Sequence, residues 1–246
     1  MLYGDYHTHT IYSHGTGTIR DNVEKAYEKG LSEIAICDHG PGHFLYGVKE
    51  EKLYEMRKEI DLLNEEYNDK GLKILLGIEA NVMNFDGDID VNENILEILD
   101  ILLLGYHYGI MPKRFKDAAR LYILNPISKV LPIGRDKIIK KNTDALISAI
   151  NRYPVKIITH PGSKAKVDVK RLAREAKKAG VCLEINSKHS ELSVENIKLA
   201  ASEDVDFVLG SDAHSKDRVA DITSGLARAR LAGLDESRII NLKSGV

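Results

Sequence analysis

Short apolar runs alternate with longer amphipathic segments along most of the chain. The apolar runs, which we predict to be strands, span residues 2–9, 33–39, 73–81, 100–107, 155–161, 181–187 and 207–214. The amphipathic segments, which we predict to be helices, span 21–30, 50–71, 144–152, 168–180 and 194–202. Several of the helical segments end at a glycine, which is favoured just past the end of a helix. This pattern predicts repeated βα units and a parallel sheet.

Seven such units favour a closed barrel of the TIM type over an open doubly wound sheet. Both topologies place ligand sites at the carboxyl ends of the strands. No glycine-rich phosphate loop follows the first strand, which argues against a dinucleotide-binding fold. We therefore expect an α/β barrel.

Composition narrows the class of protein further. With 246 residues, of which 43% are hydrophobic, we expect a single domain over 1–246 with a substantial core. The 35 basic residues are scattered among 37 acidic ones, so no nucleic-acid partner is expected. We expect no signal peptide, because no cationic segment followed by a long apolar run opens the sequence, and we expect no membrane span, because no apolar run is long enough. Cys37 and Cys182 lie in apolar stretches, which indicates buried thiols and a cytoplasmic protein.

The chemistry begins with the stretch "GDYHTHTIYSH" near the start of the chain. In a strand, alternate residues face the same side, so Asp5, His7 and His9 are expected to project together. Neighbouring neutral imidazoles pack poorly in a core but are natural ligands for a divalent cation. The stretch therefore indicates a metal site whose other ligands come from elsewhere.

Residues suited to metal binding recur at the strand ends. At or just beyond the carboxyl ends of the predicted strands stand His7, His9, His39, Glu79, His107, His160, Asn186, Asp212 and His214. Six of the seven strands supply a histidine or a carboxylate there, and in a barrel these ends converge on one cavity. Gly77, Gly105 and Gly210 each stand two positions before such a residue. They are expected to leave room for metal ions, to allow tight barrel packing, or both.

An ordered set of motifs resembles the PHP (polymerase and histidinol phosphatase) superfamily. The motifs are "DYHTHTIYSH", "CDHG", "GIEAN" followed by "DGDID", "GYH", "THPG", "LEIN" and "GSDAH". The close succession of "GIEAN" and "DGDID" makes the chain most similar to the YcdX-like stand-alone phosphatases. The resemblance implies a distorted (β/α)7 barrel that hydrolyses phosphate esters with three divalent ions. Zinc is the expected ion, with manganese or iron as alternatives.

The resemblance also implies how the metal ligands divide. One ion would take His7, His9, Glu79 and Asp212, a second would take Glu79, His107 and His160, and the third would take His14, His39 and His214. Among these, Glu79, Asp212 and His107 are the residues expected to act in catalysis. Imidazole and carboxylate ligands suit zinc or manganese, and the small number of protein ligands per ion leaves positions for water and substrate.

A mechanism follows from such a trinuclear site. Coordination lowers the pKa of water from about 16 toward 7, so a hydroxide bridging two ions can attack phosphorus. We expect Asp5 and Asp38 either to orient ligand imidazoles or to play ordinary capping roles. His43 and His189 are expected near the surface or the substrate and not among the ligands.

The segment 108–135 follows the fourth strand and is longer than YcdX-like proteins usually show there. Its cationic and aromatic residues suit a lid over a phosphorylated substrate, although an outer packing segment is an equal alternative. The residues expected to bind substrate are Asn186, Arg114, Arg135 and Lys113.

We thus expect a metal-dependent hydrolase of small phosphomonoesters, with no nucleic-acid or membrane partner. Three alternatives stay open: a histidinol-phosphate phosphatase, a PHP-type nuclease, and a non-catalytic domain stabilised by metal. The oligomeric state and the natural substrate are not predicted.

Overall fold

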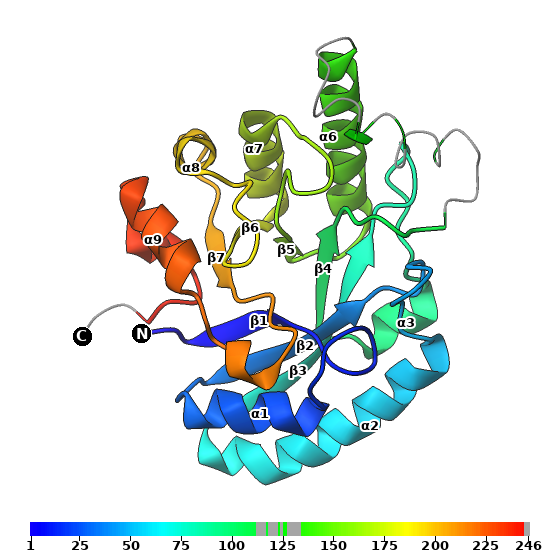
Figure 1. Cartoon of the computed structure of the whole chain (residues 1–246), viewed down its shortest axis with the longest axis vertical. Coiled ribbons are helices and arrows are strands. Elements are labelled where there is room, and N and C mark those ends of the chain that lie inside the picture. Colours follow the sequence, from blue (N-terminus) through cyan, green and yellow to red (C-terminus); the bar gives the residue numbers. More distant parts are fainter. Residues whose placement is uncertain (112–116, 118–122, 124, 127–133, 244–246) are drawn as a thin grey trace.

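The computed structural model describes residues 1–111, 117, 123, 125–126 and 134–243, and its centre is one sheet of seven parallel strands (Figure 1). The strands are β1 (Gly4–Thr8), β2 (Glu33–His39), β3 (Lys73–Asn81), β4 (Ile101–Gly105), β5 (Ile157–Ile158), β6 (Cys182–Asn186) and β7 (Phe207–Gly210), paired in this order. The sheet closes where Thr8 forms a parallel bridge with Ala213, just after β7. The predicted (β/α)7 barrel is therefore confirmed.

Every strand predicted from the apolar pattern forms, but most are shorter than the pattern. Only β2 and β3 have the predicted limits. At β4, β5 and β7 the chain leaves the sheet before it reaches His107, His160 and Asp212. Two of these residues have a backbone conformation that residues other than glycine rarely adopt, with φ of 27° at His160 and 52° at Asp212. The sharp bends turn these side chains over the end of the barrel.

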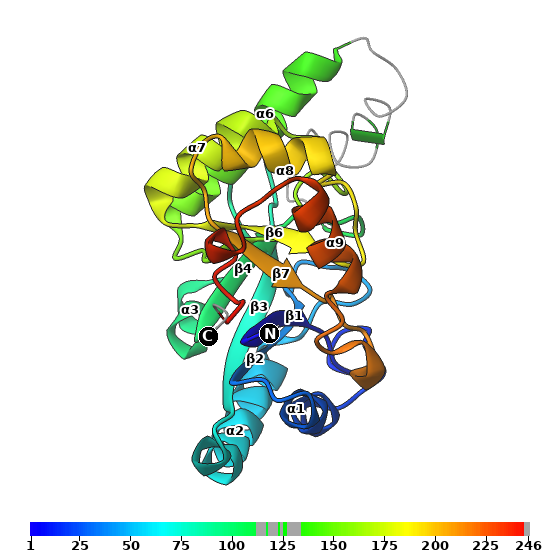
Figure 2. The ribbon, with the colours of Figure 1, turned by 90° about the vertical axis from the view of Figure 1, so that its left-hand side faces the viewer.

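The helices cover the outer face of the sheet (Figures 1 and 2). They are α1 (Ile19–Glu28), α2 (Glu50–Tyr67), α3 (Glu93–Ile98), α6 (Arg135–Arg152), α7 (Val169–Ala179), α8 (Val194–Ala201) and α9 (Thr223–Leu231). Short 3-10 helices follow at η1 (Asn68–Lys70), η3 (Lys216–Arg218) and η4 (Glu236–Arg238). The apolar pattern did not predict α3 or α9, and α6 begins earlier than its predicted start. No helix in the described part of the chain is long and apolar enough to cross a membrane.

The α1 helix shows how local sequence fixes an element boundary. The Thr18 hydroxyl accepts a hydrogen bond from the backbone N–H of Asp21, and the Asp21 carboxylate accepts one from the backbone N–H of Thr18. This reciprocal cap satisfies N–H groups that have no partner within the helix. It starts α1 shortly after the histidine-rich first motif and so fixes the length of the loop that carries His14.

The inside of the barrel is filled by a small cluster of apolar and sulfur-containing side chains. Its cluster of buried residues comprises Ala35, Cys37, Leu75, Leu103, Ile157, Cys182 and Val208. A Cβ atom on Gly77 would lie 2.3 Å from Sγ of Cys37, and one on Gly210 would lie 1.9 Å from Oε1 of Glu184. These glycines therefore admit the side chains of neighbouring strands, which is the packing role foreseen for them. Cys37 and Cys182 are free and buried, as expected.

Candidate metal centre

The side chain of Glu79 lies at the centre of the histidine cluster and is fully buried. Its Oε1 atom lies 3.1 Å from Nε2 of His107 and 2.8 Å from Nε2 of His160. Its Oε2 atom lies 3.3 Å from Nε2 of His7 and 3.1 Å from Nδ1 of His39. Both carboxylate oxygens thus face imidazole nitrogens that come from four different strands or strand ends.

The strand register brings these residues together. Residues His39 and Glu79 are paired across β2 and β3, so both side chains stand at the same level of the barrel. The next histidines come from the ends of β4 and β5, and His7 comes from β1. Because parallel strands present their carboxyl ends at one face, residues distant in sequence converge there.

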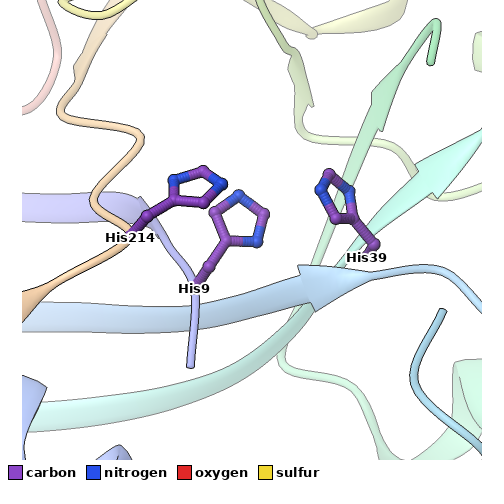
Figure 3. A group of neighbouring side chains, drawn as sticks. All are labelled: His9, His39 and His214. Atoms are coloured by element: carbon purple, nitrogen blue, oxygen red, sulfur yellow. The ribbon is translucent and has the colours of Figure 1, made fainter. Parts of the chain in front are cut away.

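Figure 3 shows a second group of imidazoles, His9, His39 and His214, which shares His39 with the first group. The ring of His9 lies 4.6 Å from that of His39 and 4.4 Å from that of His214, measured between centroids. Its Nε2 atom lies 3.1 Å from Nε2 of His7 and 3.5 Å from Oδ1 of Asp212. The two groups are therefore contiguous, with His9 between them.

Potential ligand atoms lie within 4.8 Å of one another in several sets of the described residues. The sets are His9, His39 and His214; His7, His9 and Glu79; His7, His160 and Asp212; and His39, Glu79 and His107. They are composed of residues that the sequence predicts as ligands. In the set with His39 and His214, however, His9 occupies the place expected for His14.

The ring of His14 nevertheless lies against this group. It stacks on the His39 ring at 4.8 Å and meets the His214 ring edge-on at 4.1 Å. Its Nδ1 atom is buried and has no hydrogen-bond partner.

The donor set fits divalent cations. The buried atoms without a hydrogen-bond partner include Nδ1 of His9, His14 and His39 and both carboxylate oxygens of Glu79. Burial of unpaired polar atoms destabilises a fold, so a cluster of them indicates an additional partner. Imidazole nitrogens and carboxylate oxygens are the ligands that zinc and manganese accept.

Burial and neighbouring charges shift the pKa values of the cluster's donors in different directions. Burial lowers the pKa of the imidazoles of His14 and His107 to about 3, so both are neutral and keep a lone pair. Burial opposes ionisation of Glu79, yet the adjacent His107, His7 and His160 outweigh it and hold the pKa of this carboxyl well below its usual value. Burial opposes protonation of His7 and His160, yet nearby carboxylates, chiefly Glu184 for His7 and Glu79 for His160, outweigh it and raise the pKa of both imidazoles. These two rings must lose a proton when they bind a cation.

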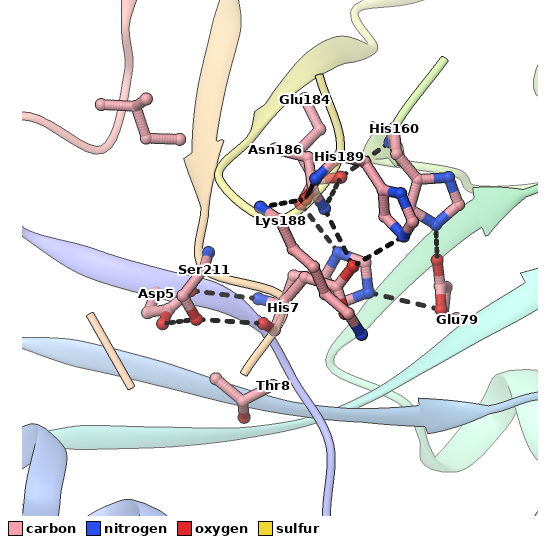
Figure 4. A network of polar contacts seen from close by, with 12 residues as sticks. Asp5, His7, Thr8, Glu79, His160, Glu184, Asn186, Lys188, His189 and Ser211 are labelled. Carbon is pink, nitrogen blue, oxygen red and sulfur yellow. Dashed lines mark hydrogen bonds and ion pairs between the residues drawn. The ribbon is translucent and has the colours of Figure 1, made fainter. Parts of the chain in front are cut away.

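The ring of His7 is oriented by a carboxylate that the sequence did not single out for this purpose (Figure 4). Oε1 of Glu184 lies 2.7 Å from Nδ1 of His7. Oε2 of the same carboxylate accepts hydrogen bonds from the backbone N–H of His160 at 2.7 Å and from Nδ2 of Asn186 at 2.9 Å. Glu184 thereby links three strands below the cluster. The "LEIN" motif was the available signal, since Glu184 and Asn186 share one face of β6.

Asp5 and Asp38 tie the first motif to other segments of the barrel. The Asp5 carboxylate accepts hydrogen bonds from the Ser211 hydroxyl and from the N–H of Ala220 at 2.9 Å. The Asp38 carboxylate accepts hydrogen bonds from the N–H of Thr10 at 2.8 Å and from its hydroxyl at 2.6 Å. These contacts fall on backbone and hydroxyl groups, which supports the capping role. The register of β1 shifts after Asp5. The regular alternation of side chains that predicted a common side for Asp5, His7 and His9 therefore does not hold there.

A cavity of about 300 Å³ opens over the cluster. It is lined by His14, His39, His43, Tyr46, Glu79, His107, Tyr108, His160, Lys164, Lys188, His189, Asp212 and His214. Both His43 and His189 line it, and their expected position near the substrate stays a prediction. The two lysines were not predicted, although each follows one of the motifs, Lys164 after "THPG" and Lys188 after "LEIN".

Lys188 reaches the cluster of histidines and carboxylates itself. Its Nζ atom lies 3.0 Å from Nδ1 of His214 and 3.6 Å from Oδ1 of Asp212. The loop that carries it is held by Arg228 of α9, whose guanidinium donates to the carbonyl oxygens of Asn186 and His189. The ammonium group of Lys188 is therefore carried by an anchored loop.

The predicted substrate-binding residues fall in different places. Asn186 is buried, with its Oδ1 accepting the N–H groups of Lys188 at 2.9 Å and His189 at 2.8 Å. Arg135 is the first residue of α6 and is not among the described residues that line the cavity. The predicted lid residues Lys113 and Arg114 lie outside the described residues, so the lid over 108–135 stays a prediction.

Comparison with known proteins gives one family. The profile of the PHP domain matches residues 5–188. A protein of Shewanella sediminis named probable phosphatase is 32% identical over 252 residues, which cover 96% of this chain and 88% of that protein. A probable phosphatase of Shewanella sp. strain W3-18-1 is 34% identical over 257 residues, which cover 98% and 88%.

Two solved structures share the fold. The hisK protein of Listeria monocytogenes matches with a TM-score of 0.64 at 17% identity, over 88% of this chain and 97% of that one. The histidinol phosphate phosphatase of Lactococcus lactis, solved with zinc, L-histidinol and phosphate, matches with a TM-score of 0.62 at 16% identity, over 95% of both chains. At these identities the likeness concerns the barrel and not the substrate.

Proposed function

This chain belongs to the PHP family and is a metal-dependent phosphatase, and from that premise we propose that it hydrolyses small phosphomonoesters with three divalent metal ions. Zinc is the proposed ion. The proposal treats 1–246 as one catalytic domain.

The contacts of Glu79 carry the proposal. Each of its two oxygens faces two imidazole nitrogens, at distances between 2.8 and 3.3 Å. A carboxylate in this position can bridge two cations, each completed by histidines. The residues that would hold the ions are His7, His9, His14, His39, Glu79, His107, His160, Asp212 and His214.

When bound, the ions would supply a water of lowered pKa as the nucleophile and would neutralise the phosphate oxygens during displacement. The protein's own residues supply position and charge. Glu79 and Asp212 contribute the negative charge that holds cations together in a buried site. His107 donates a neutral nitrogen beside Glu79. No serine or cysteine nucleophile is needed for this chemistry.

The lysines Lys164 and Lys188 suit the phosphate group of the substrate. Both line the cavity, and an ammonium group forms strong charge-assisted hydrogen bonds with phosphate oxygens. Tyr46 and Tyr108 line the same cavity and provide apolar surface for the leaving group. A volume of about 300 Å³ lies at the lower end for ligand pockets and favours a small substrate.

A phosphate-release screen combined with elemental analysis tests this function. The panel contains sugar phosphates, nucleotides and histidinol phosphate, together with labelled single-stranded DNA in the presence of manganese. We expect about three metal equivalents per chain and turnover of at least one small monoester. Preference for histidinol phosphate would identify it as the substrate and leave the class of reaction unchanged. Degradation of DNA alone would make the protein a nuclease, and bound metal without turnover of any ester would make it a non-catalytic domain.

A further inference from the structure

The segment "DGDID" after β3 supplies none of the proposed metal ligands. The chain nevertheless folds this segment back against Asn81, which contacts the ligand His107. Val82 forms an antiparallel bridge with Ile89, and the N–H of Met83 donates to the carbonyl of Asp88 at 2.7 Å. This tight return places Asp90 beside Asn81, the last residue of β3.

The carboxylate of Asp90 then dictates how the Asn81 amide is turned. Its Oδ1 atom accepts a hydrogen bond from the backbone N–H of Asn81 at 2.7 Å. Its Oδ2 atom accepts one from Nδ2 of Asn81 at 2.5 Å and one from the N–H of Gly42 at 2.9 Å. Each oxygen of Asp90 accepts a backbone N–H, so this side chain presents hydrogen-bond acceptors and the NH₂ group of Asn81 faces it. Its Oδ1 atom must therefore face the other way.

The atom on the other side is Nδ1 of His107, at 2.7 Å from Oδ1 of Asn81. An amide oxygen accepts only, so Nδ1 carries the proton and Nε2 of the neutral ring keeps its lone pair. The Nε2 atom points to the centre of the cluster, 3.1 Å from Oε1 of Glu79 and 3.3 Å from Nε2 of His160.

We propose that Asp90 is a positioning residue that, acting through Asn81, fixes the His107 tautomer whose Nε2 is free to bind a metal ion. These contacts form a relay from Asp90 through Asn81 to His107. The relay extends the proposed function and rests on it only for the identity of the ion that Nε2 binds. It differs from the arrangement at His7, where the Glu184 carboxylate meets the ring directly.

The surroundings of Asp90 are shaped to admit its carboxylate. A Cβ atom on Gly40 would lie 2.4 Å from Oδ2 of Asp90, and one on Gly42 would lie 2.7 Å from its Cβ. The two glycines belong to "DHGPGH", the motif that carries His39. Three motifs of the sequence therefore meet at this carboxylate. A purely structural role, in which Asp90 only ties these loops together, is the competing explanation.

The first test replaces Asp90 by the isosteric Asn in the zinc-loaded, full-length protein. Without an obligate acceptor, the Asn81 amide is free to turn, and its NH₂ group can then face His107. We expect the Nδ1–H signal of His107 in ¹H–¹⁵N spectra of ¹⁵N-histidine-labelled protein to be lost or split. The affinity for one metal equivalent should fall by about 10–100-fold in a competition titration with a chelator.

The matched control is Asp88→Asn. Asp88 lies two residues away in the same turn and contacts Nδ2 of Asn84 at 2.6 Å and the guanidinium of Arg152 at 2.9 Å. This variant changes the same turn without touching Asn81, so it should keep the His107 signal and the metal affinity. An equal loss in Asp88→Asn and Asp90→Asn would mean that the loop, and not the relay, supports the site, and would overturn the proposal.

A charge-swapped double variant, Asn81→Asp with Asp90→Asn, guards against a simple folding defect. The carboxylate introduced at position 81 would still accept the proton of His107 Nδ1, so the signal and most of the metal affinity should return. Failure of this rescue in a variant that unfolds at the wild-type temperature would overturn the relay. A protein that shows the expected His107 signals but hydrolyses no phosphomonoester would instead contradict the proposed function and leave the relay intact.

Discussion

The Oε1 atom of Glu184 lies 2.7 Å from Nδ1 of His7, although 177 positions separate the two residues in the chain. The contact joins β6 to β1 across the interior of the barrel. It is buried, with both side chains no more than 2% exposed. A carboxylate on the outer nitrogen of a ligand imidazole fixes the ring's orientation and increases its basicity.

Replacement of Glu184 by Gln should therefore weaken metal binding without removing a ligand. We expect about a 10–100-fold loss of affinity for the ion held by His7, measured by chelator competition. The matched control is Glu191→Gln, a residue of the following loop whose side chain is 43% exposed. Unchanged affinity in Glu184→Gln would show that His7 does not need this partner.

Replacement of Glu79 by Gln keeps the size of the side chain and removes the charge between the imidazoles. The turnover of the preferred ester should fall by about a thousandfold or more, because one carboxylate is proposed to hold two ions. Circular dichroism should show that the barrel survives. Activity within about tenfold of the wild type would remove Glu79 from the bridging role.

The His14→Ala variant tests the third ion. Loss of one of three neutral ligands should lower the metal content by about one equivalent per chain, as read by elemental analysis after gel filtration. His43→Ala is the matched control, since His43 stacks on His39 at 5.3 Å and lines the same cavity but is not a proposed ligand. Full metal content in His14→Ala would assign that ion to His9, His39 and His214, the set whose ligand atoms the structure brings together.

The Lys188→Ala variant tests the phosphate contact. A charge-assisted hydrogen bond contributes about 1.5–3 kcal/mol, so kcat/KM should fall by about 10–100-fold and inhibition by inorganic phosphate should weaken similarly. The control is Lys178→Ala, an exposed lysine of α7 that pairs with Glu175 on the outside of the barrel. A loss of metal content in Lys188→Ala would mean that Lys188 supports the cluster and does not contact the substrate.

The Gly210→Ala variant tests the packing below the cluster. Its methyl group would lie 1.9 Å from Oε1 of Glu184, so we expect a destabilisation of about 1–3 kcal/mol in denaturant unfolding together with weaker metal binding. Combining it with Glu184→Ala removes the clash. The double variant should then be more stable than the sum of the single changes predicts. Strict additivity would show that the barrel relaxes in another way.

Much of the fold could be predicted because buried parallel strands have a plain sequence signature. The β2 and β3 strands are continuous apolar runs, and their predicted limits match the structure. The β5 strand is regular for only two residues, and the apolar pattern overestimates it because burial continues into the loop that bears His160. The α9 helix was not predicted, since Gly225 lies in it, close to the carbonyl of Ile185.

The roles of polar residues near the cluster were harder to predict. Asn186 stays a predicted substrate-binding residue, and the structure shows in addition that it organises the loop that bears Lys188 and His189. In the sequence, Asp90 is recognised only as part of the "DGDID" motif. Its hydrogen bond with Asn81 depends on the turn after β3, which brings the two residues together.

The sequence alone determined that seven apolar runs alternate with helices and that histidines and carboxylates stand where those runs end. That much follows from local periodicity and from the geometry of parallel strands, which brings their carboxyl ends to one face. Only the tertiary structure decided which nitrogen of His107 faces Glu79 and which carboxylate supports His7. These relationships depend on bends, register shifts and hydrogen bonds a few ångströms long between segments far apart in the chain, and no local pattern specifies such distances.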